Sequence, residues 1–102
     1  MKDFRTELKR SDENEWLVKR LDINQALNIS IQASEYSYCS PRELLFDLQE
    51  YYQFELGFPN FTPPDYIMEY AENPDEPQET VYGYVPYELI QRMIDELRST
   101  AC

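Results

Sequence analysis

The chain contains no histidine and only two glycines. Without histidine it lacks the side chain that most often moves protons near neutral pH, and it cannot form a Cys–His or Ser–His nucleophile pair. The isolated glycines, Gly57 and Gly83, cannot build a glycine-rich phosphate-binding loop. Carboxylates are abundant, but no spacing marks a pair held across a cleft for glycoside chemistry. The sequence therefore predicts a protein that is not an enzyme, with no catalytic residue and no cofactor.

Cysteine is also scarce, since Cys39 and Cys102 are the only two. Cysteines this far apart make neither a disulfide framework nor a zinc knuckle. Cys39, in "YCSPRE", would be a reactive thiol only if it capped a helix near Arg42, and a buried or half-buried structural cysteine is the simpler interpretation. The acidic stretch "NPDEPQE" lacks the alternating ligands and the glycine of an EF-hand loop, so we expect no metal site.

Long hydrophobic runs are absent as well. The apolar runs span only a few residues, so no segment is predicted to cross a bilayer. The N-terminal stretch "MKDFRTELKR" is charged and is not followed by the apolar region of a secretory signal. We therefore expect a cytoplasmic protein with no membrane partner. Its 102 residues suit a single domain over residues 1–102.

Positive charge is missing from the middle of the chain. Residues 1–42 carry seven basic and seven acidic side chains, which cancel, whereas residues 43–102 carry two basic and thirteen acidic ones. The whole net charge of −11 therefore arises in the last sixty residues, and no lysine or arginine occurs from Glu43 to Gln91. A field of this sign repels nucleic acid and attracts basic protein surfaces. We expect no direct nucleic-acid binding and a partner with a basic surface.

In the N-terminal third, "SDENEWLVKRLD" (residues 11–22) predicts a short helix. Ser11 suits the N-cap, acidic residues fill the first turns, and Lys19 and Arg20 lie near the end, as the helix dipole favours. Trp16, Leu17 and Leu21 would form its apolar stripe. The following segment, residues 26–34, alternates strictly and predicts a half-buried strand, with one face formed by Leu27, Ile29, Ile31 and Ala33.

Two interpretations stay open for residues 35–50. Ser40, Pro41 and Glu43 have the order of a helix start, whereas a turn leading into the next strand is the competing interpretation. Residues 51–59 then alternate as a second strand that Pro59 ends. The pattern places Tyr52, Phe54, Leu56 and Phe58 on one face, of which Phe54, Leu56 and Phe58 are predicted to be core. The other face, directed outward, would carry Tyr51, Gln53, Glu55 and Gly57.

The last third predicts a helical turn, an acidic loop, a strand and a helix. Tyr66, Ile67 and Tyr70 would share the turn after Pro63 and Pro64, and the residues up to 79 would form an exposed acidic loop. A third strand over 80–85 would place Thr80, Tyr82 and Tyr84 opposite Val81, Gly83 and Val85. The helix over 86–99 begins with Pro86, pairs Glu88 with Arg92, and carries an apolar stripe of Leu89, Ile90, Met93, Ile94 and Leu97.

These elements predict an α+β fold: a small antiparallel sheet of about three strands with helices on one face, including a C-terminal helix. Two strand faces and one helix stripe leave apolar surface unassigned. The C-terminal helix is therefore also compatible with a homodimer interface.

The acidic region is unusually rich in tyrosine, which supplies large, rigid contact area with a polar tip. Tyr82 and Tyr84 fit either packing beneath a helix or a contact surface. The acids fit either a solvated face that maintains solubility or a site for a basic partner. On the second interpretation the predicted partner-binding residues are Glu55, Asp65, Tyr66, Glu69, Tyr70, Glu72, Asp75, Glu76, Glu79, Tyr82, Tyr84 and Glu88.

Three stretches, "IQASEYSYCSPRE", "FELGFPN" and "ETVYGYVPYELIQRMID", together resemble a group of small uncharacterised proteins of bacteriophages and mobile elements. The resemblance spans about residues 29–95 and does not include residues 1–25. It carries no catalytic residue. It implies an accessory phage factor, of which many inhibit a host enzyme, as anti-CRISPR and anti-restriction proteins do.

Charge and resemblance together favour a phage-type inhibitor that binds and blocks a nucleic-acid-binding host defence protein, anti-CRISPR-like, by mimicking the charge of nucleic acid. Charge would steer the encounter and buried aromatics would hold the complex. Two alternatives stay open. One is an immunity protein or antitoxin against a basic nuclease toxin, and the other is a structural protein of a virion. The inhibitor would act in the cytoplasm of the host bacterium.

Overall fold

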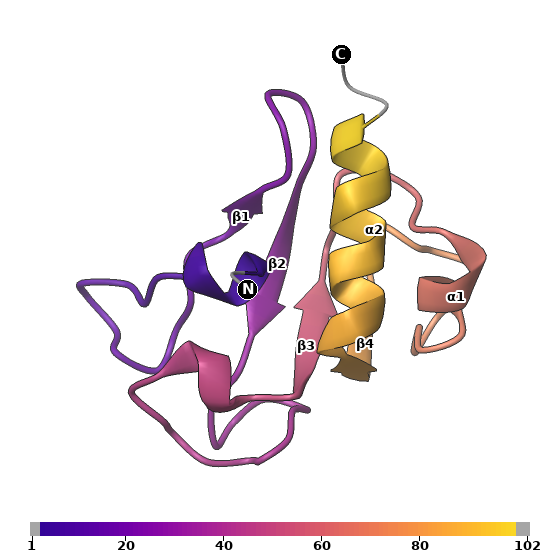
Figure 1. The fold of residues 1–102 in the computed structure, drawn as a ribbon. Coiled ribbons are helices and arrows are strands. Elements are labelled where there is room, and N and C mark those ends of the chain that lie inside the picture. The colour runs from indigo at the N-terminus through magenta and orange to yellow at the C-terminus, as the bar shows by residue number, and fades with distance from the viewer. Residues whose placement is uncertain (1–2, 100–102) are drawn as a thin grey trace.

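A computed structural model describes residues 3–99 and contains a four-stranded antiparallel sheet with helices against it (Figure 1). The strands are β1 (Leu21–Asp22), β2 (Asn28–Gln32), β3 (Gln53–Gly57) and β4 (Val81–Pro86), and they lie side by side in chain order. The helices are α1 (Asp65–Met68) and α2 (Tyr87–Ser99), with two 3₁₀ turns, η1 (Phe4–Thr6) and η2 (Leu48–Glu50). The predicted α+β class is confirmed, with four strands in place of about three.

Strand β4 carries one residue more than β3 between two matched pairs. Phe54 pairs with Val85 and Leu56 pairs with Tyr82, so Glu55 alone lies opposite both Gly83 and Tyr84. Such a β-bulge disrupts the alternation of the longer strand. Tyr84 accommodates it with a φ of 56°, in the left-handed region that side chains rarely adopt.

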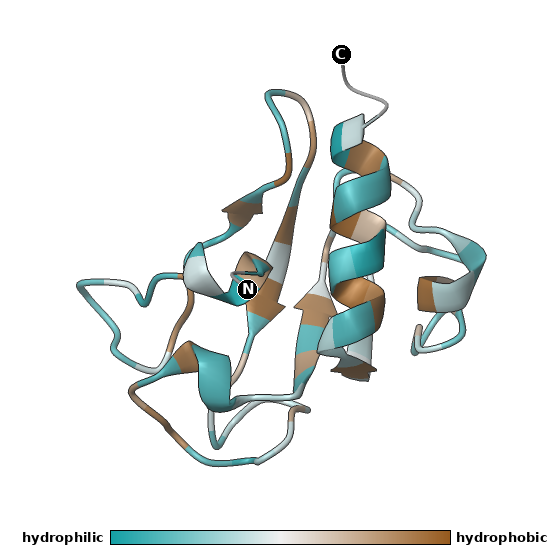
Figure 2. Cartoon of the chain, viewed as in Figure 1, coloured by the Kyte–Doolittle hydropathy of each residue, from teal (hydrophilic) through white to brown (hydrophobic). Residues whose placement is uncertain are grey.

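The core lies between the sheet and α2, which Figure 1 shows packed in front of β3 and β4. In α2 the residues Ile90, Met93 and Ile94 are fully buried, as the stripe predicted, and Leu89 and Leu97 are partly buried. Figure 2 shows the same helix as brown bands between hydrophilic ones. The sheet contributes the buried side chains of Ile29, Ile31, Phe54, Leu56, Tyr82 and Val85.

The N-terminal segment is tied to α2 at both ends of the helix. The Phe4 N–H donates to Gln91 Oε1 at 2.6 Å, and the Arg5 guanidinium lies 3.9 Å from the centre of the Tyr87 ring. At the other end, Arg98 donates two hydrogen bonds to the Glu7 carboxylate, at 2.8 and 2.9 Å. The predicted Glu88–Arg92 pair does not form, because Arg92 bonds to Glu96 at 3.5 Å.

The helix predicted over residues 11–22 is wrong. The segment forms a loop that returns on itself, with an antiparallel bridge between Arg10 and Val18, and its last two residues are β1. Gln32 explains the extended backbone, because its side-chain amide accepts from the Val18 N–H at 2.8 Å and donates to the Val18 carbonyl at 2.7 Å. Ser11 accepts a hydrogen bond from the Glu13 N–H rather than capping a helix.

Residues 33–47 contain no helix, so the helix start at Ser40 and Pro41 is wrong and the turn interpretation holds. Tyr51 organises this segment. Its hydroxyl donates to the Glu43 carbonyl and accepts from the Leu45 N–H at 2.8 Å. Because these bonds draw Tyr51 into the core, it is fully buried, and its predicted place on the outward face of a strand is wrong.

The alternation predicted for the second and third strands breaks at their ends. Phe54 and Leu56 are buried as predicted, but Tyr52 and Phe58 are exposed because they flank β3 rather than belong to it. Phe58 has a φ of 48°, which turns the chain after Gly57. The bulge separates Tyr82, which is buried, from Tyr84, which is exposed, so the two tyrosines do not share a face.

The two glycines provide a matched test of this packing, since neither has a positive φ. A Cβ at Gly57 would meet Val81 Cγ1 at 3.6 Å, which is ordinary contact, whereas a Cβ at Gly83 would lie 3.2 Å from Tyr38 Cβ. We expect Gly57→Ala to raise the free energy of unfolding by about 0.4–1 kcal/mol through the unfolded state. Gly83→Ala should lower it by about 1–3 kcal/mol through overpacking. Urea denaturation measures both, and a shift of the same sign in the two variants would contradict the bulge geometry.

Candidate functional site

A pocket of about 280 Å³ opens on the face of the sheet opposite the core. Its floor comes from the three longer strands, whose register places Gln32 beside Glu55 and Gly57 between Ser30 and Val81. Its walls come from two loops and from the residue that follows β3, namely Trp16, Leu17, Tyr36, Ser37 and Phe58. The Trp16 and Tyr36 rings meet edge to face, with centroids 5.6 Å apart.

Glu55 is the acidic side chain of the pocket floor, and it is half-buried. Burial raises the pKa of its carboxyl above the ordinary value, because the charged form loses water. A hydrogen bond from the Tyr38 backbone N–H opposes this shift, the charge of Glu72 adds to it, and the charge of Arg42 opposes it. Arg42 lies 5.3 Å from the centre of the Tyr38 ring.

The segment around Tyr38 closes one end of the sheet face over the bulge. The Tyr84 N–H donates to the Tyr38 carbonyl at 2.9 Å, and the two rings lie 5.9 Å apart. The lack of a side chain at Gly83 allows this approach, since the Cβ that it lacks would press on Tyr38. The β-bulge thus fixes where the chain passes beside Glu55.

The acidic segment, residues 65–79, borders the outer edge of the sheet. Ala71 forms a bridge to Tyr82, and the Glu72 N–H donates to the Val81 carbonyl at 3.0 Å. The loop that follows has its own backbone bonds, Glu76 N–H to Asn73 and Glu79 N–H to Glu76. Its backbone is therefore organised, and the edge of β4 is partly covered.

The predicted acidic contact residues of this segment and of α2 are exposed. Within residues 3–99 the ion pairs are Arg5–Asp3, Arg92–Glu96 and Arg98–Glu7. None of these pairs neutralises a member of the predicted exposed set, which consists of Asp65, Glu69, Glu72, Asp75, Glu76, Glu79 and Glu88.

The predicted tyrosines are placed differently from one another. Tyr82 is fully buried and its hydroxyl donates to the Pro77 carbonyl, so its assignment to the contact surface is corrected: it anchors the acidic loop from within the core. Tyr66 is half-buried, bonds to Glu96, and stacks with Arg92 at 4.2 Å. Burial, followed by the bond to Glu96, raises the pKa of Tyr66 to about 12. Tyr70 is half-buried and Tyr84 is exposed.

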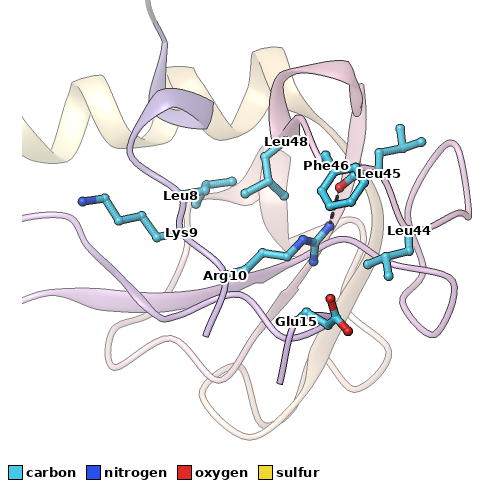
Figure 3. A pocket seen from close by; sticks show the side chains of 8 residues that line it. All are labelled: Leu8, Lys9, Arg10, Glu15, Leu44, Leu45, Phe46 and Leu48. Carbon is cyan, nitrogen blue, oxygen red and sulfur yellow. Dashed lines mark hydrogen bonds between the residues drawn. The ribbon is translucent and has the colours of Figure 1, made fainter. Parts of the chain in front are cut away.

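A second hollow, of about 490 Å³, lies between the N-terminal segment and the 44–48 loop (Figure 3). Arg10 spans it and donates to the Leu45 carbonyl at 3.1 Å. Its lining is chiefly apolar, from Leu8, Leu44, Leu45 and Leu48, and the Phe46 side chain beside it is fully exposed. Glu15 lines this hollow while its neighbour Trp16 lines the sheet pocket, so the 15–17 loop separates the two.

Other chemistry finds little support in the side chains. Cys39 is buried, and burial raises the pKa of its thiol, which agrees with the structural interpretation; Cys102 lies outside the described residues. Among residues 3–99, no three His, Cys, Asp or Glu side chains are grouped so that they could hold a metal ion. In the same range, neither helix combines the length and the apolar character needed to cross a membrane.

No family model, curated protein or solved structure matches the chain. The resemblance to phage proteins therefore stays a prediction. Sequence reasoning found Glu55 but missed the aromatic walls around it. The predicted helix placed Trp16 on an apolar helix stripe, and the strand alternation placed Phe58 in the core. Neither pattern predicted that the two rings would lie around Glu55.

The raised pKa of Glu55 predicts an unusual dependence of stability on pH. Because its pKa in the folded state lies above the ordinary 4.5, the wild type loses stability as pH rises from about that value through the folded pKa. Glu55→Gln removes this loss. We expect the variant to be more stable than wild type at pH 7 and equal to it below pH 4.5, as urea denaturation at several pH values would measure.

Glu7 is the matched control, because the hydrogen bond from Arg98 lowers its pKa. Its stabilising contribution is present above the ordinary pKa and is lost as pH falls through the folded one. Glu7→Gln should therefore be less stable than wild type at pH 7. If Glu55→Gln is also destabilised at pH 7, the carboxylate does not carry the burial penalty assigned to it.

Proposed function

We propose that the protein is a stoichiometric inhibitor that binds the basic surface of a nucleic-acid-binding protein and blocks it. Its acids would take the place of phosphates, and lysine and arginine side chains of the target would bind them. The resemblance to phage proteins favours a more specific target, a defence protein of the host, as anti-CRISPR proteins have. The inhibitor would bind this target in the cytoplasm of the host bacterium.

The observation that carries this proposal is the lack of internal neutralisation. The two arginines that follow residue 43, Arg92 and Arg98, are both engaged within the fold, with Glu96 and Tyr66 and with Glu7. The acids of residues 65–79 are exposed on an organised loop. Like charges held close together repel one another, and no ion pair within residues 3–99 reduces the repulsion among these carboxylates. A basic partner would reduce it.

The size of the surface is compatible with a specific complex. A standard interface buries about 800 Å² on each partner, which is roughly an eighth of the 6257 Å² accessible surface of this chain. The acidic segment alone would supply the polar part of such a patch. Exposed rings beside it, of which Tyr84 is one, would supply the apolar contact that usually dominates binding energy.

The first test is the charge reversal Asp75→Lys, Glu76→Lys and Glu79→Lys in one variant. The affinity column carries wild type or variant and receives a lysate of the source organism or its host, at about 0.1 M and about 1 M salt, where the Debye lengths are about 10 and 3 Å. We expect wild type to retain one nucleic-acid-binding protein at low salt and to lose it at high salt. The reversed variant should retain none at either salt, and mass spectrometry identifies the retained protein.

The control reverses three exposed acids outside the segment, Asp12→Lys, Glu43→Lys and Glu50→Lys, so that net charge changes equally. This control should keep the partner, and circular dichroism should be unchanged in both variants. Equal loss in both would show that only net charge matters, and equal retention would overturn the charge-mimic mechanism. Retention of a nuclease toxin would favour the immunity-protein alternative.

A further inference from the structure

The pocket on the outer face of the sheet has a glycine in its floor that the backbone conformation does not require. Gly57 forms part of its floor although its φ is not positive, so the backbone at this position does not require glycine. A Cβ here would fit at ordinary contact distances, 3.6 Å from Val81 Cγ1 and 3.9 Å from Ser30 Cβ. The consequence of glycine at this position is open space above the strand.

Among the polar side chains of the floor, Glu55 differs from its neighbours. Gln32 uses its amide on both backbone groups of Val18 and on Ser30 Oγ, at 2.7 to 2.9 Å. The Glu55 carboxylate has a hydrogen bond from the Tyr38 backbone, but none of the ion pairs within residues 3–99 involves it. The charge of Arg42 acts on this carboxylate, but the two side chains form no ion pair. A half-buried carboxylate that is not bonded to a cation favours a cation as its ligand.

The walls of the pocket favour the same ligand. Trp16, Tyr36 and Phe58 are 41%, 67% and 52% exposed, so three large rings surround the opening in contact with water. Aromatic faces attract a cation electrostatically, and most strongly a planar guanidinium that can also stack. Phe58 is held in place despite its positive φ, because its N–H donates to Thr80 and its carbonyl accepts from Arg20 at 2.7 Å.

The pocket is slightly smaller than usual for a whole small molecule, which favours a single side chain as its ligand. At about 280 Å³ it lies just below the range of roughly 300–1,000 Å³ that is usual for small-molecule sites. We propose that this pocket receives an arginine side chain of the basic partner, with Glu55 as the counter-charge and Trp16, Tyr36 and Phe58 as the walls. The source of the arginine rests on the proposed function above.

The pocket and the acidic segment adjoin each other. Glu72, which belongs to the acidic segment, is near enough to Glu55 for its charge to act on that carboxyl. Its backbone bonds to Val81, which is part of the pocket floor. One basic surface could therefore contact the segment while a single projecting arginine enters the pocket.

The test uses a capped pentapeptide with one arginine among glycines, and its counterpart with citrulline, which keeps the shape and lacks the charge. Trp16 is the only tryptophan of the chain, so its fluorescence reports on the pocket wall. We expect the arginine peptide to change this fluorescence saturably and the citrulline peptide to bind at least tenfold more weakly. Equal binding of the two would overturn the proposal, and equal binding of a lysine peptide would overturn the assignment to arginine.

Two variants alter the pocket in different ways. Glu55→Gln removes the charge and keeps the shape, whereas Gly57→Val fills the floor, and each should weaken the arginine peptide at least tenfold. Glu50→Gln removes one exposed carboxylate from η2 and should have no effect. Unchanged binding by Glu55→Gln would overturn the proposal even if Gly57→Val failed to fold.

The reversal of Asp75, Glu76 and Glu79 separates this inference from the proposed function. That variant should lose the partner from the lysate and still bind the arginine peptide. If the wild type binds no arginine peptide but retains a partner that the reversed variant loses, the pocket assignment falls and the inhibitor function stands. Peptide binding by a wild type that retains no partner would leave the pocket assigned and contradict the inhibitor.

Discussion

The one-residue mismatch between β3 and β4 is the constraint on which both faces of the sheet depend. Because Glu55 opposes two residues of β4, Tyr82 and Val85 can both be buried against α2 although an odd number of positions separates them. The intervening residues, Gly83 and Tyr84, lie beside Tyr38 on the other face. The same irregularity thus completes the core on one side and positions the carboxylate and the chain beside it on the other.

The basic and acidic side chains are distributed unevenly along the chain. Residues 1–42 contain seven of the nine basic residues, and three of the arginines bind within the fold. Arg5 and Arg10 donate to backbone carbonyls of residues 45–51, and Arg20 donates to the Phe58 carbonyl. The two arginines of α2 are engaged as well. Within residues 3–99, no ion pair joins a base to the acidic segment. The backbone of this segment is held by its own hydrogen bonds and by Tyr82 beneath it. A surface of this kind is suited to a partner rather than to the interior of the protein.

Local patterns in the sequence predicted the elements that are regular and failed where side chains act over long range. The stripe of α2 and the alternation of β2 follow from residues that all face one core, so period alone sufficed. The N-terminal helix failed because the Gln32 amide, fourteen residues away, bonds to the Val18 backbone and holds it extended. Tyr51 and Tyr84 were misplaced for similar reasons, a hydroxyl network in one case and a bulge in the other. The acidic part of the site could be predicted from the sequence, because charged side chains are usually exposed. The aromatic walls could not, because they come from segments that are distant in the sequence, and no local pattern predicts that these segments lie close together.

The most direct measurement of the central claim is amide hydrogen exchange of the chain alone and in complex with the partner that the affinity column retains. An interface built on the acidic segment and the sheet pocket predicts slower exchange over residues 69–81 and in the loops around Trp16 and Tyr36. Exchange in α2 beyond its first turn and over the 44–48 loop should stay unchanged. Protection confined to α2 or to the apolar hollow beside Phe46 would contradict the account, because it would place the partner on a surface that the acids do not form.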